Sequence, residues 1–166
     1  MQLKPKTFCF RSDLFQVSKD EDEETNPFCY GKSLAKWLHQ EFSQIGYQPE
    51  PIIADDWGWC LMLQREPFML WIACGNDRSA YYETVTPEQK SDFVPDAEEI
   101  LWHCAVIDEV PFWKMFFWKK LVGIVSTDEA VDTVRTELYQ ILTNESRIHL
   151  ISETSPETSE CANAQK

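Results

Sequence analysis

Long apolar runs and basic residues are both scarce in this chain. The longest apolar stretches of its 166 residues, at 68–74 and 112–118, are too short to cross a membrane, and the first ten residues contain no signal-peptide core. Lys and Arg number 15 against 28 Asp and Glu, so the formal net charge is -13. That balance opposes a Lys- and Arg-rich surface that binds nucleic acid through its phosphates. We therefore expect a cytoplasmic protein with neither a membrane nor a nucleic-acid partner.

Motifs for metal binding and nucleophilic catalysis are scarce as well. The six cysteines include no C-x-x-C pair, and His39, His103 and His149 lie on separate predicted elements, so we expect no metal site. The chain has no G-x-S-x-G turn. The Gly31-Lys32-Ser33 string lacks the glycine that a phosphate loop needs five positions before its Gly-Lys-Ser. We expect a protein that is not an enzyme and binds no cofactor. A Cys–His pair assembled in space stays open.

Apolar residues are plentiful and periodic. Hydrophobic residues make up 43% of the chain and aromatic residues 13%, which suits one packed domain. Their spacing predicts an α+β fold, a mainly antiparallel sheet of about five to six strands with two helices packed on one face, in the order β-α-β-β-β-β-α-β. Strands are predicted at 7–17, 52–54, 57–64, 68–74, 100–110 and 148–151, and helices at 27–45 and 126–142. The domain would span 1–152, with 153–166 a disordered polar tail.

Local signals predict where the helices begin and end. Asn26 followed by Pro27 is typical of a helix start, and Gly46 of a left-handed C-terminal cap. Ser126, with Glu129 three residues later, predicts a capping box for the last helix.

Acidic residues are concentrated in two segments. One is a block of five consecutive acids, which predicts a solvated loop because like charges repel each other. The other is the polar excursion at 83–99. We predict that the two segments form a surface that attracts a basic protein partner. The candidate contact residues in the block are Asp20, Glu21, Asp22, Glu23 and Glu24.

The segment 112–121 mixes five aromatic residues with three lysines. Three interpretations are open: stacking on single-stranded nucleic acid, a core connector whose lysines reach outward, and a partner surface. The acidic residues before it oppose the first. We favour the core for most of the rings and a partner contact for one or two, with Trp113 and Phe117 as the candidate anchors.

The most distinctive string is Asp55-Asp56-Trp57-Gly58-Trp59. Its two carboxylates could form an acid/base pair, but neighbours on a strand point to opposite faces. We therefore favour a structural motif. Asp55 or Asp56 would accept backbone N–H bonds in a turn, and Trp57 and Trp59 would cover the same side of the sheet.

Three segments carry a resemblance: D-D-W-G-W at 55–59, P-F-M-L-W-I-A-C-G-N at 67–76 and F-W-K-K-L-V-G-I-V-S-T-D at 117–128. Over residues 28–152 the chain resembles a family of small uncharacterised bacterial proteins, and its general plan is similar to the immunity proteins that neutralise bacterial toxins. The resemblance implies a fold and no catalytic residues.

The leading hypothesis is a non-enzymatic, immunity-like inhibitor, monomeric or homodimeric, that masks a basic protein such as a cognate toxin. A small hydrolase-like enzyme using Asp55 or Asp56, and a self-associating accessory protein, are the alternatives.

Overall fold

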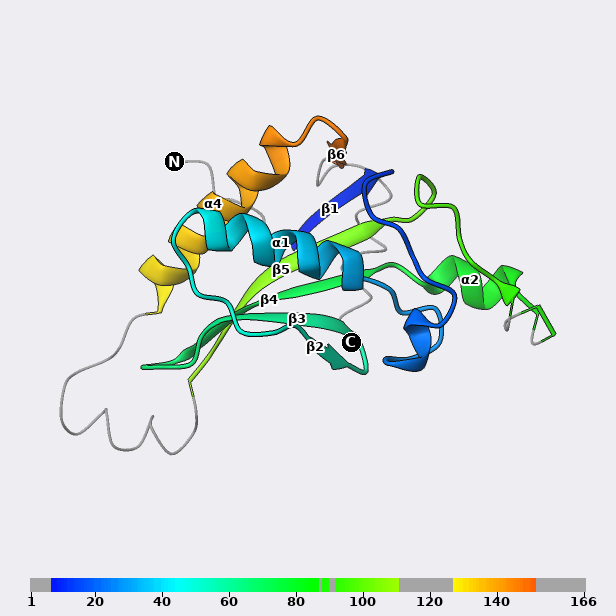
Figure 1. Cartoon of the computed structure of the whole chain (residues 1–166), viewed down its shortest axis with the longest axis horizontal. Helices are drawn as coiled ribbons and strands as arrows, with labels where there is room; N and C mark the ends of the chain where they lie inside the picture. Colours follow the sequence, from blue (N-terminus) through cyan, green and yellow to red (C-terminus); the bar gives the residue numbers. More distant parts are fainter. Residues whose placement is uncertain (1–6, 87, 90–91, 111–126, 152–166) are drawn as a thin grey trace.

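One antiparallel sheet organises the molecule, and the long helices cover one face of it (Figure 1). The structure is a computed structural model that describes residues 7–86, 88–89, 92–110 and 127–151. The strand order across the sheet is β2-β3-β4-β5-β1-β6. The strands are β1 Thr7–Ser12, β2 Ile53–Asp55, β3 Gly58–Gln64, β4 Met69–Asn76, β5 Trp102–Glu109 and β6 Ile148–Leu150. The helical elements are η1 Glu21–Glu23 (a 3-10 turn), α1 Lys32–Gln44, α2 Ser79–Thr84 and α4 Asp128–Asn144.

This architecture confirms the predicted α+β fold and its mainly antiparallel sheet. Each predicted strand has its counterpart, and α1 and α4 occupy the two predicted helical segments. The short helix α2 is an addition, because no helix was predicted between the strands at 68–74 and 100–110. No helix in the described residues has both the length and the apolar character of a membrane span.

The core lies between α1, α4 and one face of the sheet. Alternate residues of β3, among them Trp59 and Leu61, point into it, as a strand with one buried face requires. Leu38 of α1 and Leu138 of α4 are fully buried against the same cluster. Both helices bury their apolar stripes against this one face of the sheet, and the loops form the polar ends of the molecule.

The C-terminus of α1 was correctly predicted. Gly46 has a φ of 102°, and its N–H donates to the carbonyl of Ser43. The N–H of Tyr47 reaches back to the carbonyl of Phe42, and the rings of these two residues lie 5.3 Å apart. This is a Schellman motif with its usual apolar contact.

The predicted start of α1 is wrong. Asn26 and Pro27 lie in a loop, and the helix begins only at Lys32. Phe28 has a φ of 62° and Gly31 a φ of 150°, and neither angle is helical. The Tyr30 N–H donates to the side-chain oxygen of Asn76, 46 residues further along the chain. The hydrogen bond to the distant Asn76, and not the local Asn26-Pro27 signal, therefore fixes the chain just before α1.

At the start of α4 the predicted N-cap residue, Ser126, lies outside the described residues. Thr127 stands at the N-cap position without a side-chain cap bond. Its hydroxyl instead donates to Asp108 Oδ2 at 2.5 Å, which ties the helix to the end of β5. The cap position therefore falls at Thr127, one residue after the predicted one.

Candidate functional site

The five-acid block contains the 3-10 turn η1, and the first residue of that turn, Glu21, is buried. Glu21 is 2% exposed. Its Oε1 accepts the N–H of Gly31 at 2.7 Å and the N–H of Lys32 at 2.8 Å. These are donors at the start of α1, where a helix leaves N–H groups without intrahelical partners and favours negative charge. The prediction of a solvated loop is wrong for Glu21, which stabilises a helix terminus and is not available to a partner.

Asp22 also holds the loop before α1. Its Oδ2 accepts the N–H of Phe28 at 2.9 Å. This bond stabilises Phe28 in its positive-φ conformation, which non-glycine residues rarely adopt. The other predicted contact residues of the block, Asp20, Glu23 and Glu24, are exposed.

An aromatic cluster joins this loop to the α2 excursion. The Phe28 ring lies 6.0 Å from Tyr81, 5.4 Å from Tyr82 and 5.8 Å from Phe93, measured between ring centroids. The Tyr82 hydroxyl donates to the carbonyl of Pro27 at 3.2 Å. Burial raises the pKa of Tyr81 to about 12, so its phenol stays protonated. Edge-to-face ring pairs add stability beyond the area they bury.

The cluster brings the two predicted acidic segments to one end of the molecule, where η1 lies beside α2 (Figure 1). The Lys19 ammonium donates to Asp92 Oδ1 at 2.7 Å, which links the segments directly. This hydrogen bond and the Lys19 charge hold the pKa of Asp92 below its usual range. We call the exposed acids gathered here the acidic surface: Asp20, Glu23, Glu24, Glu83, Glu88 and Asp92. Glu98 and Glu99 lie elsewhere, beside Arg11.

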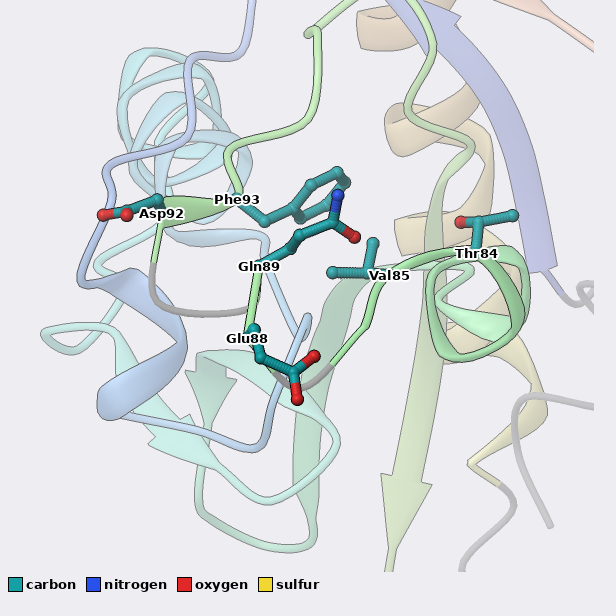
Figure 2. A pocket seen from close by; sticks show the side chains of 6 residues that line it. All are labelled: Thr84, Val85, Glu88, Gln89, Asp92 and Phe93. Carbon is teal, nitrogen blue, oxygen red and sulfur yellow. The ribbon is translucent and has the colours of Figure 1, made fainter.

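A shallow hollow of about 600 Å³ lies within the excursion, among Thr84, Val85, Glu88, Gln89, Asp92 and Phe93. Figure 2 shows the Asp92 carboxylate turned away from the other labelled side chains. The hollow therefore presents Phe93, at the edge of the aromatic cluster, together with Glu88. Sequence reasoning missed Tyr81, Tyr82 and Phe93, although the adjacent tyrosines in a polar segment were a signal of local packing.

The distinctive strings of the sequence converge on the end of β4. A side chain at Gly58, whose φ is 152°, would place its Cβ 2.5 Å from the carbonyl oxygen of Cys74. A Cβ at Gly31 would lie 2.9 Å from the same oxygen. Asn76 accepts the Tyr30 N–H and donates to the carbonyl of Phe28. The D-D-W-G-W and C-G-N strings thus have a packing role at the base of the acidic surface.

The two aspartates of that string lie at an exposed hairpin turn between β2 and β3. Asp55 Oδ1 accepts the N–H of Asp56 at 2.7 Å, and the carbonyl of Asp56 accepts the Asn26 side chain at 2.6 Å. These turn bonds favour the structural interpretation over acid/base catalysis, which needs carboxyls that converge in a recess.

The tryptophans do not share a side, contrary to expectation. Trp59 is 2% exposed in the helix-side core, whereas Trp57 stacks on Trp71 of the opposite face. Trp57 occupies the turn before β3, so the alternation along that strand does not apply to it.

Among the described residues, four cysteines carry free thiols: Cys29, Cys60, Cys74 and Cys104. Burial raises the pKa of each of them, which disfavours the thiolate that a nucleophile requires. Within the same residues no group of three His, Cys, Asp or Glu side chains is placed to hold a metal ion. Trp113 and Phe117, the predicted aromatic anchors, lie outside the described residues, as does the tail at 153–166.

Comparison of the chain with protein-family models, with curated proteins and with solved structures finds no match. The resemblance to small bacterial proteins and to immunity proteins therefore stays a prediction, and the geometry of the site carries the functional argument.

Proposed function

We propose that the protein is a non-enzymatic inhibitor that binds and masks a basic protein, as an immunity protein masks its toxin. The observation that carries the proposal is the union of two sequence-distant acidic segments into the acidic surface. The Phe28 cluster and the Lys19–Asp92 ion pair both maintain that union. Because exposed ion pairs contribute little stability, the packed rings of the Phe28 cluster are the main support of this placement of charge.

The mechanism is electrostatic steering followed by steric masking. A surface of one sign attracts a partner of the opposite sign during diffusion and can raise the association rate by about 10- to 1000-fold at low ionic strength. Screening shortens the range of this attraction to ~8 Å in physiological salt. Once docked, the inhibitor covers the functional surface of its partner.

The test begins with capture of a partner on the immobilised full chain at low salt, followed by its elution with salt. The association rate of the purified partner is then measured with two charge-matched variants. In the first, Asp20→Asn, Glu23→Gln and Glu83→Gln neutralise the acidic surface. In the control, Glu109→Gln, Glu129→Gln and Asp132→Asn remove equal charge from exposed positions elsewhere.

We expect the first variant to associate at least about threefold more slowly than the control, and the difference to vanish at high salt. The partner should also lose its activity at equimolar inhibitor. Equal association rates for the two variants, an unimpaired partner, or failure to capture any protein would each refute the proposal. Turnover of a small substrate by the pure chain would establish an enzyme instead.

A further inference from the structure

The sheet has a second face, opposite α1 and α4. Strand register places Cys60, Met62, Trp71, Ala73 and Ile107 together on it, because directly paired residues point to the same side. We call it the far face, since both long helices pack against the other side of the sheet (Figure 1). Cys60, Met62 and Ala73 are buried on it, whereas Trp71 and Ile107 are partly exposed.

Two indoles lie in contact on the far face. The Trp57 and Trp71 ring centroids are 5.3 Å apart, with the ring planes inclined by 35°. Both residues are partly exposed. A turn residue and a strand residue thus form one continuous aromatic platform.

Asp55 lies on the same face as the platform, and Asp56 follows it in the turn that leads to Trp57. Asp55 pairs with Gly58 and Ile53 with Cys60, so the Asp55 side chain lies on the same face as the Cys60 thiol. Burial and, after it, the Asp55 charge raise the pKa of Cys60 to about 11, which agrees with this placement. Asp56 follows at the exposed tip of the turn.

Indole faces attract cations, and an adjacent carboxylate strengthens the attraction. The chain already uses this combination on the other side of the same hairpin. There the Lys32 ammonium lies 4.8 Å from the Trp59 ring centroid and forms an ion pair with Glu24. At the Trp57–Trp71 platform the indoles and the carboxylates are in place, and the cation would come from a second molecule.

We propose that Trp57, Trp71, Asp55 and Asp56 form a docking site for an arginine side chain of a protein partner. Arginine fits better than lysine because its planar guanidinium stacks on an aromatic face while its N–H groups reach a carboxylate. The net charge of -13 favours a cationic partner residue. The proposal rests on the proposed function and names the anchor of the same interface, since Asn26 ties Asp56 to the loop that carries the acidic surface.

The probe is an acetylated and amidated Gly-Arg-Gly peptide, compared with the same peptide carrying citrulline, which is neutral and nearly isosteric. Both are titrated into the full chain labelled with ¹⁵N, and the indole N–H signals are followed. The signals of Trp57 and Trp71 are assigned from Trp57→Phe and Trp71→Phe. Trp59 and Trp102, which are 2% and 0% exposed, serve as internal references.

We expect the arginine peptide to shift the Trp57 and Trp71 signals saturably, with an affinity at least about fivefold above that of the citrulline peptide. Asp55→Asn retains the acceptor of the turn and should weaken binding about two- to fivefold, whereas the matched variant Asp132→Asn on α4 should not. Equal shifts with citrulline, or unchanged affinity in Asp55→Asn and Trp71→Leu, would overturn the inference.

This inference and the proposed function fail separately. If a captured partner associates in the salt-dependent way described above but dissociates no faster from Trp71→Leu, the platform is not its anchor and the acidic surface stands. If the arginine peptide binds while charge neutralisation leaves partner association unchanged, the platform stands and the steering proposal fails.

Discussion

Replacing Glu21 with alanine tests whether the acidic block is a structural element of α1. The substitution removes the acceptor of two N–H groups, on the buried Gly31 and on Lys32. Loss of an N-terminal helix cap costs about 0.5–2 kcal/mol, and a buried N–H left without a partner costs about 1–3 kcal/mol. Because the two costs overlap at Gly31, we expect Glu21→Ala to lower the free energy of unfolding by about 2–4 kcal/mol.

Two further variants separate geometry from charge. Glu21→Gln keeps a side-chain oxygen for both donors but loses the negative charge at the start of α1, an effect of about 0.3–2 kcal/mol. Glu23→Ala removes an exposed carboxylate of the same turn and should change stability by less than about 0.5 kcal/mol.

Thermal and urea unfolding provide the measurement. For a chain of this size, each kcal/mol corresponds to about 2–4 °C in Tm. We expect Tm to fall by about 5–15 °C in Glu21→Ala and by less in Glu21→Gln, with Glu23→Ala near the parent. If Glu21→Ala and Glu23→Ala had the same Tm, the Glu21 carboxylate would not stabilise the start of α1, and the argument from its two hydrogen bonds would be wrong.

Substitutions at His103, Gly58 and Trp59 test the stability of the fold at three other positions. Burial lowers the pKa of His103 to about 4, against the opposing effect of Asp77, from an ordinary value of 6.5. The unfolded chain therefore binds a proton at His103 more readily than the folded chain does. The contribution of neutral His103 to the free energy of unfolding should be fully present above pH 6.5 and fall by on the order of 3 kcal/mol as the pH drops to 4. Urea unfolding at a series of pH values measures this change. His103→Gln should flatten that dependence, and an unchanged slope would contradict it. Gly58→Ala should lower stability by more than about 1 kcal/mol, since its Cβ would meet the Cys74 carbonyl, and an unshifted melting curve would refute the clash. Trp59→Ala should cost about 3–5 kcal/mol in urea unfolding, and a cost below 1 kcal/mol would mean that the ring is not a core residue.

The elements that could be predicted from the sequence are those whose signals are local. Alternating apolar residues predicted the central strands, and the 3.6-residue spacing of Leu34, Leu38 and Phe42 predicted α1. Both patterns reflect which side of an element is buried, and the fold confirms both predictions. Gly46 ends α1 as predicted because a Schellman motif is complete within six residues.

The errors arise where distant residues replace local signals. Asn76, at the end of β4, accepts the Tyr30 N–H, and Glu21 accepts the next two N–H groups along the chain. The run of acids was predicted to be solvated because no sequence pattern indicates that one of them accepts hydrogen bonds from a helix terminus ten residues away. The side of the sheet on which Trp57 lies was also wrongly predicted, because strand alternation does not extend into a hairpin turn.

The acidic block therefore has two roles, and they lie on different residues. Glu21 and Asp22 accept backbone N–H bonds of the loop before α1, while Asp20, Glu23 and Glu24 face solvent. Replacing all five acids at once would confound binding with folding, because a loosened α1 start would also disturb the Phe28 cluster beneath the acidic surface. We expect a variant with serine at all five acidic positions to melt at least as low as Glu21→Ala, whereas Asp20→Asn with Glu23→Gln should keep the parent Tm and still slow association. If the double variant destabilised the fold as much as Glu21→Ala does, the separation of roles within the block would be refuted.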